Sequence, residues 1–96
     1  MEDADKRKIM IVVLDRGYVE VCQVPQYPEA YALWMPVWNS RTIRYWGTTE
    51  GLGELANGPT PETRLDAKVP SGQFPVRAII KMLDVDQSKW SAHLGV

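Results

Sequence analysis

The sequence predicts a mainly β (or α+β) fold, a small antiparallel β-barrel or β-sandwich of about five or six strands. Two apolar, strand-like runs flank the turn sequence DRG, as in a β-hairpin. Strand-like patterns then recur as far as Trp46, with connections of hairpin length, which is typical of an antiparallel meander. Barrel and sandwich stay open as alternatives, because short alternating runs do not give the strand order.

The N-terminal part of the chain predicts a tail followed by a hairpin. Residues 1–8 (MEDADKRK) are charged and lack apolar periodicity, so we expect a solvated tail there and a single β-rich domain over residues 9–96. The run from Ile9 to Asp15 is short, apolar and β-branched, which favours a strand buried on both faces. Residues 18–24 alternate in character and predict the second arm of the hairpin.

Two further strands are expected before Trp46. The segment PQYPEAY contains two prolines, which lack a backbone donor, and it predicts a loop or a blunted edge. Residues 32–40 (ALWMPVWNS) predict a short third strand bent at Pro36. Residues 41–46 (RTIRYW) predict a fourth strand, in which Arg44 and Trp46 share one face while Ile43 and Tyr45 point to the other.

The second half predicts little regular structure apart from one strand and two short helical pieces. Gly47 is followed by Thr48 and Thr49, either of which can cap a short helix near residues 49–56. The sequence Asn57-Gly58-Pro59 ends that helix. A fifth short strand is expected around residues 64–69, a longer strand in FPVRAIIKMLDV, and a C-terminal helical turn carrying Trp90.

Composition limits the classes of function. Ninety-six residues suit one domain, and 11 basic against 12 acidic side chains argue against a general nucleic-acid coat or an electrostatic membrane binder. Near-zero net charge also favours a homo-oligomer. Cys22 is the single cysteine, so no internal disulfide forms, and no run of about 18 apolar residues occurs. We therefore expect a protein of the reduced cytoplasm with no membrane segment.

The sequence contains few groups suited to catalysis. His93 is the single histidine, and no metal-ligand spacing such as C-x-x-C is present, so we expect no metal and no cofactor. No G-x-S-x-G elbow occurs. Glu50 and Glu54 could act as an acid–base pair, but a helix N-terminus already gives them a structural role. We expect a protein that is not an enzyme.

The segment WGTTEGLG is the strongest candidate for ligand binding. It combines the end of a strand, a glycine and two hydroxyls at a helix start, where backbone N–H groups can face an anion. An arginine beside an exposed tryptophan can also hold a phosphate while a base stacks. The alternative is a tight strand-to-helix corner with capping threonines. The expected ligand-binding residues are Arg44, Trp46, Gly47, Thr48, Thr49 and Arg64.

A resemblance rests on the same segment. The chain reads R-x-W-G-T-T-x-G-L-G-E-L from Arg44 to Leu55, followed by G-P-T-x-x-T-x-L-D from Gly58 to Asp66. This pattern, which covers about a quarter of the chain, resembles small uncharacterised proteins of phage and prophage genomes. The resemblance implies a phage-encoded accessory protein acting in the cytoplasm of an infected bacterium. The PQYPEAYALWMPVWNS segment lies outside the shared pattern.

Two functions follow as hypotheses. The first is a phage counter-defence protein that binds and sequesters a nucleotide-derived immune signal without turnover, with the site between subunits of a homo-oligomer. The second is a protein-interaction module, either an inhibitor of a host defence complex such as CRISPR or a virion structural or accessory protein. Its expected interface is formed by Trp34, Met35, Trp38 and Tyr45.

Overall fold

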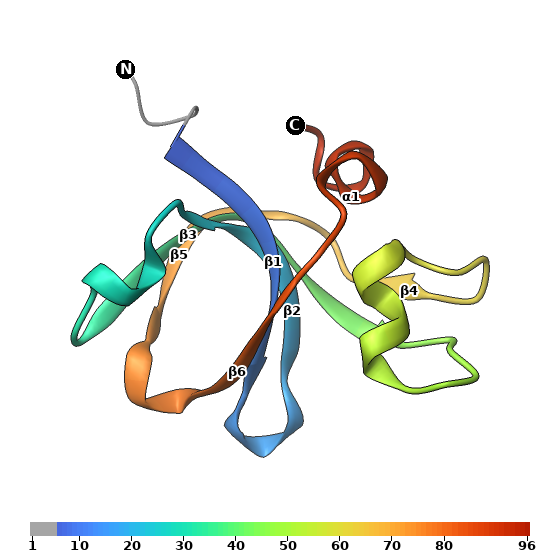
Figure 1. The fold of residues 1–96 in the computed structure, drawn as a ribbon, viewed down its shortest axis with the longest axis horizontal. Coiled ribbons are helices and arrows are strands. Elements are labelled where there is room, and N and C mark those ends of the chain that lie inside the picture. Colours follow the sequence, from blue (N-terminus) through green and yellow to red (C-terminus); the bar gives the residue numbers. More distant parts are fainter. Residues whose placement is uncertain (1–5) are drawn as a thin grey trace.

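One curled antiparallel sheet of six strands forms the frame of the computed structural model, which describes residues 6–96 (Figure 1). Its strands are β1 (Arg7–Leu14), β2 (Val19–Pro25), β3 (Trp34–Tyr45), β4 (Arg64–Leu65), β5 (Val69–Pro75) and β6 (Ile79–Asp84). The order is β4-β3-β2-β1-β6, with β5 also paired to β3. The predicted mainly antiparallel β fold is confirmed, and the sheet is open rather than closed into a barrel.

The predicted N-terminal hairpin is confirmed. β1 and β2 pair antiparallel in one continuous register that places Ile11 opposite Val21. The turn between them is tight, with Arg16 and Gly17 both at positive φ, and Leu14 N donates to Tyr18 O at 2.8 Å. Residues 1–5 of the expected tail lie outside the described residues, while Arg7 and Lys8 already belong to β1.

The expected third and fourth strands are one strand, β3, with a bulge in its middle. The pairing of β3 with β2 shifts by one residue between Val21–Arg41 and Gln23–Trp38, so that β3 holds one extra residue opposite Cys22. Asn39 adopts φ 54° there, a conformation that asparagine tolerates better than most residues. Pro36 is accommodated because β2 pairs with β3 only from Trp38 onward.

The sheet carries a hydrophobic cluster on each face. The first contains alternate residues of β1 and β2 and is covered by α1 (Gln87–Leu94) and the 3-10 helix η4 (Leu52–Asn57), which lie outside the curl in Figure 1. The second lies within the curl, where side chains of β5 and β6 reach the same cluster. Ile9 to Val12 are all buried and alternate between the clusters, as predicted for a strand buried on both faces.

The helical pieces differ in how well the sequence predicted them. The expected C-terminal helical turn carrying Trp90 is the helix α1, which is capped by the Asp86 carboxylate through hydrogen bonds from the N–H groups of Ser88 and Lys89. η4 begins at Leu52 rather than at Thr49, and neither threonine caps it. The two pieces are joined by Trp90, whose Nε1 donates to Leu55 O at 2.8 Å in a buried contact.

The predicted late strands are divided differently in the structure. The expected fifth strand is represented by the two residues of β4 and by the start of β5 at Val69. The segment FPVRAIIKMLDV is not one strand, because the 3-10 turn η5 (Val76–Ala78) separates the end of β5 from β6. Within residues 6–96, no helix combines the length and the apolar character needed to cross a membrane.

Candidate functional site

The corner after β3 is held by two threonines that come later in the chain. Thr60 Oγ1 donates to Gly47 O and Thr63 Oγ1 donates to Trp46 O, both at 2.7 Å. Gly47 adopts φ 68°, and a Cβ there would lie 2.5 Å from the Glu62 carbonyl carbon. Much of the G-T-T and T-x-x-T pattern therefore forms a structural clasp.

The backbone N–H groups expected to face an anion are already occupied. Glu54 Oε1 accepts from Thr49 N at 3.0 Å and from Glu50 N at 3.1 Å. Because the chain supplies its own carboxylate, an external anion would have to displace it. The expectation that these threonines cap a helix and leave donors open is wrong in this respect.

Arg44 is likewise engaged within the chain. Its Nε and one terminal nitrogen donate to the two carboxylate oxygens of Asp66. This bidentate pair raises the pKa of the guanidinium and lowers the pKa of Asp66, chiefly through the hydrogen bond between them. The positive charge of Arg44 is therefore already balanced by the carboxylate of Asp66.

The expected ligand-binding residues are only partly brought together. One hollow of about 350 Å³, here called the corner hollow, is lined by Arg44, Tyr45, Trp46, Gly47 and Thr48. Thr49 lines a different hollow beside Glu50 and Glu54, whose acidic character disfavours an anion. Arg64 lies in β4 opposite Tyr45 and lines neither hollow.

The residues expected to form one partner interface are not brought together at one hollow. Met35 is 1% exposed and packs within the curl, so its assignment to an exposed interface is wrong. Trp34, Trp38 and Tyr45 line three separate hollows. The bulge at Asn39 changes which side chains of β3 share a face: Met35 and Val37 before it pack in the cluster within the curl, whereas Ile43 after it packs in the cluster under α1 and η4.

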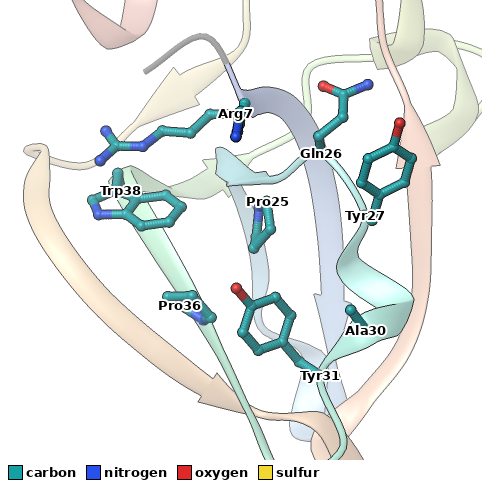
Figure 2. Close-up of a pocket in the computed structure, with 9 residues that line it drawn as sticks. Arg7, Pro25, Gln26, Tyr27, Ala30, Tyr31, Pro36 and Trp38 are labelled. Carbon is teal, nitrogen blue, oxygen red and sulfur yellow. The ribbon is translucent and has the colours of Figure 1, made fainter. Parts of the chain in front are cut away.

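A larger cavity, here called the aromatic groove, lies at the open end of the β1–β2 hairpin (Figure 2). Its volume is about 600 Å³, within the usual range of small-molecule sites. Figure 2 shows the Arg7 side chain extending over Trp38, with Tyr31 and Tyr27 along the cavity. The groove is lined by Lys6, Arg7, Pro25, Gln26, Tyr27, Ala30, Tyr31, Pro36 and Trp38.

Short backbone contacts shape the aromatic groove. Gln26 N donates to Lys6 O at 2.6 Å, which ties the start of β1 to the end of β2. The 3-10 turn η3 (Pro28–Ala30) then reverses the chain, and Tyr31 N donates to Pro28 O at 3.2 Å. The two prolines of PQYPEAY thus place Tyr27 and Tyr31 at either end of one turn, both with exposed rings.

The charged side chains that line the aromatic groove are basic, Lys6 and Arg7. The Arg7 guanidinium lies 3.8 Å from the centre of the Trp38 ring, which is a cation–π contact. Arg7 Nε is buried and has no hydrogen-bond partner in the described part of the chain, residues 6–96. None of the nine lining residues is acidic, and no carboxylate of residues 6–96 forms an ion pair with Lys6 or Arg7. Two cations therefore face the cavity without an internal counter-charge from its walls.

Cys22 and Glu20 on β2 are engaged in contacts within the fold. Cys22 is fully buried, and burial, with a smaller contribution from Glu20, raises the pKa of its thiol. Glu20 itself accepts hydrogen bonds from Ser40 Oγ and Thr42 Oγ1. Residues 6–96 contain no group of three or more His, Cys, Asp or Glu side chains placed to hold a metal ion.

Comparisons of the chain with protein-family models, with curated proteins and with solved structures found no match.

Proposed function

We propose that this protein binds a nucleotide-type small molecule in the aromatic groove, without turnover. The observation that carries the proposal is the Arg7 guanidinium stacked on Trp38, with a buried and unpartnered Nε, at the wall of a cavity of about 600 Å³. A buried donor without a partner is costly, and a ligand oxygen would satisfy it. The proposal keeps the class of ligand expected from sequence and moves its site from the corner hollow.

The two ends of such a ligand match two kinds of side chain in the groove. Lys6 and Arg7 provide positive charge for phosphate, and Arg7 can donate from more than one nitrogen. Tyr27 and Tyr31 offer exposed rings on which a base can stack, a contact worth about 1–3 kcal/mol per base. The protein has a net charge of −1, so attraction of an anion depends on these local cations.

Capture without chemistry fits the lining of the groove. Its nine residues include no carboxylate, histidine or thiol that could serve as a general base or a nucleophile. In the context of the resemblance to small phage proteins, the biological role we propose is counter-defence, in which the protein sequesters a nucleotide-derived immune signal of the host.

The test is binding of defined nucleotides by isothermal titration calorimetry. The probes are nucleoside mono- and diphosphates, cyclic mononucleotides and cyclic dinucleotides. For a probe that binds, Arg7→Gln should weaken affinity about 10- to 150-fold, because a charge-assisted hydrogen bond is worth about 1.5–3 kcal/mol. Tyr31→Ala should weaken it about 5- to 150-fold through lost stacking.

The matched control is the double variant Arg44→Ala with Thr48→Ala, which alters the corner hollow and leaves the aromatic groove intact. It should bind as the wild type does. Loss of binding in this control, with Arg7→Gln unaffected, would return the site to the corner hollow. Failure of every probe to bind the wild type would reject the nucleotide proposal.

A second candidate function is recognition of a protein partner through the same groove. Pro25, Pro36, Trp38 and the two tyrosines give it the aromatic and proline surface that binds extended, proline-rich peptides. Lys6 and Arg7, which form no ion pair within residues 6–96, favour the nucleotide, because a proline-rich segment brings no phosphate. Binding of a proline-rich peptide that is lost in Tyr31→Ala but kept in Arg7→Gln would favour this second function.

A further inference from the structure

A separate hollow, here called the Trp34 cleft, lies where the β1–β2 turn, the start of β3 and η5 meet. Its volume is about 670 Å³, and it is lined by Asp15, Ala32, Leu33, Trp34, Pro75, Arg77 and Ala78. Its walls are fixed by a hydrogen bond from Val76 N to Leu33 O at 2.9 Å and by the pairing of Trp34 with Pro75. It shares no residue with the aromatic groove.

The Trp34 cleft exposes large apolar side chains beside two charges. Leu33 is 77% exposed and Trp34 is 54% exposed, although neighbouring Met35 is buried. Asp15 and Arg77 are also exposed, and neither forms an ion pair within residues 6–96. An apolar patch bordered by unpaired charges is the composition of a protein interface with a hydrophobic centre and a polar rim.

We propose that the Trp34 cleft is the interface of a two-fold symmetric homodimer of this chain. In such a dimer both subunits use the same surface. If one residue of the first subunit contacts a second residue of its partner, the reverse contact also forms. A surface with one acid and one base is complementary to its own copy, because Asp15 of each subunit faces Arg77 of the other. Leu33 and Trp34 pack about the symmetry axis, where they are buried from solvent.

The charges of the Trp34 cleft favour a second copy over a different partner. The cleft carries one residue of each sign, so a second copy supplies an opposite charge for both Asp15 and Arg77. The net charge of −1 also imposes little repulsion between two copies. The dimer does not depend on the proposed ligand, because the two hollows have no residue in common.

The charge pattern allows a test by complementary charge reversal. Native mass spectrometry and light scattering after gel filtration should find a dimer of the wild type at about 100 µM protein. Asp15→Arg places two arginines opposite each other, and Arg77→Asp places two aspartates opposite each other. Each variant should weaken the dimer at least about tenfold.

An equal mixture of the two variants should form a heterodimer, because both cross-subunit pairs are then of opposite sign. Heterodimer formation also shows that each variant is folded. Glu62→Arg and Arg64→Asp are the control reversals, since both residues are exposed and lie outside the cleft. Trp34→Ala should also dissociate the dimer.

Three results would overturn the proposal. The first is a wild type that is monomeric at about 100 µM. The second is a dimer that persists in both charge reversals and in Trp34→Ala. The third is a mixture of Asp15→Arg and Arg77→Asp that stays monomeric although near-ultraviolet circular dichroism shows both variants folded.

Discussion

At the scale of single residues, the WGTTEGLG segment and the threonines that follow it mainly build the corner after β3. Gly47 permits the close approach of the Thr60–Thr63 turn, whose hydroxyls bind the carbonyls of Trp46 and Gly47. Glu54 occupies two backbone donors in the same loop. Side chains that take up a structural role in this way are not available to a ligand, and this is why we propose a ligand site in the aromatic groove instead.

The clasp predicts a large cost for a methyl group at Gly47. Gly47→Ala should lower the free energy of unfolding by at least about 1–2 kcal/mol, because alanine is strained at φ 68° and its Cβ would lie 2.5 Å from the Glu62 carbonyl carbon. Urea denaturation measures the loss. Gly53→Ala is the matched control, since that Cβ would meet nothing within 4 Å. Equal stabilities of the two variants would contradict the clasp.

Asp86 gives a prediction about pH. Hydrogen bonds, first from the Ser88 hydroxyl and then from the backbone of Lys89 and Ser88, hold the pKa of its carboxyl below the ordinary value. A lowered folded-state pKa contributes stability at pH above the ordinary value of about 3.9, and this contribution is lost as the pH falls through the folded-state pKa. Asp86→Ala should therefore lower Tm at pH 7, and the gap to wild type should narrow in acid.

The variant Asp86→Asn distinguishes the hydrogen bonds that cap α1 from the ionisation of the Asp86 carboxyl group. Asparagine keeps an oxygen that accepts from the helix N-terminus but does not ionise, so this variant should melt close to wild type at pH 7. Its Tm should depend less on pH below about 4 than that of the wild type. Thermal melts between acid and neutral pH check both variants. A wild-type pH profile in Asp86→Asn would show that this carboxylate contributes nothing to acid sensitivity.

At the scale of elements, the sequence predicted what local pattern determines and missed what depends on distant strands. The hairpin followed from the β-branched run and the DRG turn, and a C-terminal helical turn carrying Trp90 was expected where α1 lies. The bulge in β3 could not be predicted, because it is defined by pairing with β2. The split between β5 and β6 likewise depends on β3 and β1 as partners.

Part of the aromatic groove could have been predicted from the sequence by working out the register of the β1–β2 hairpin. A turn centred on Arg16 pairs Arg7 with Pro25, which places the basic end of the first strand beside the PQYPEAY segment. The expectation of a solvated tail through residue 8 hid this pairing. The contact of Arg7 with Trp38 could not be predicted, since Trp38 reaches it only through the β2–β3 pairing opposite Gln23.

The docking of α1 predicts a specific role for the Trp90 indole. Trp90→Phe removes one of the two donors to Leu55 O, which keeps the hydrogen bond from Gly58 N at 3.0 Å. The lost hydrogen bond should cost about 0.5–1.5 kcal/mol of unfolding free energy in addition to the lost volume. Chemical denaturation gives the value. Trp46→Phe is the control, because Trp46 is 41% exposed and should change stability by less than about 0.5 kcal/mol. A Trp90→Phe variant as stable as this control would refute the role.

At the scale of the whole molecule, one open sheet supports two cores. The cluster within the curl and the cluster under α1 and η4 lie on opposite faces of the same central strands, β1 and β2. If either cluster came apart, the strands that carry the other cluster would lose the packing on one of their faces. Domains of this size usually unfold in one cooperative step, and shared strands favour that behaviour. The edges β5 and β6 are joined by η5 but belong to opposite ends of the sheet.

Cys22 tests this cooperativity, because it is the single thiol and lies on β2 in the cluster within the curl. It is fully buried, and burial raises its pKa, so the native thiol is neither accessible nor ionised at neutral pH. Labelling by an aromatic disulfide should be at least about a thousandfold slower than in the denatured chain, given the usual stability of small domains. The logarithm of the rate should rise with urea at the slope of global unfolding measured by circular dichroism. A rate that is independent of urea would instead indicate local opening of the β2–β3 pairing, where the Asn39 bulge faces Cys22.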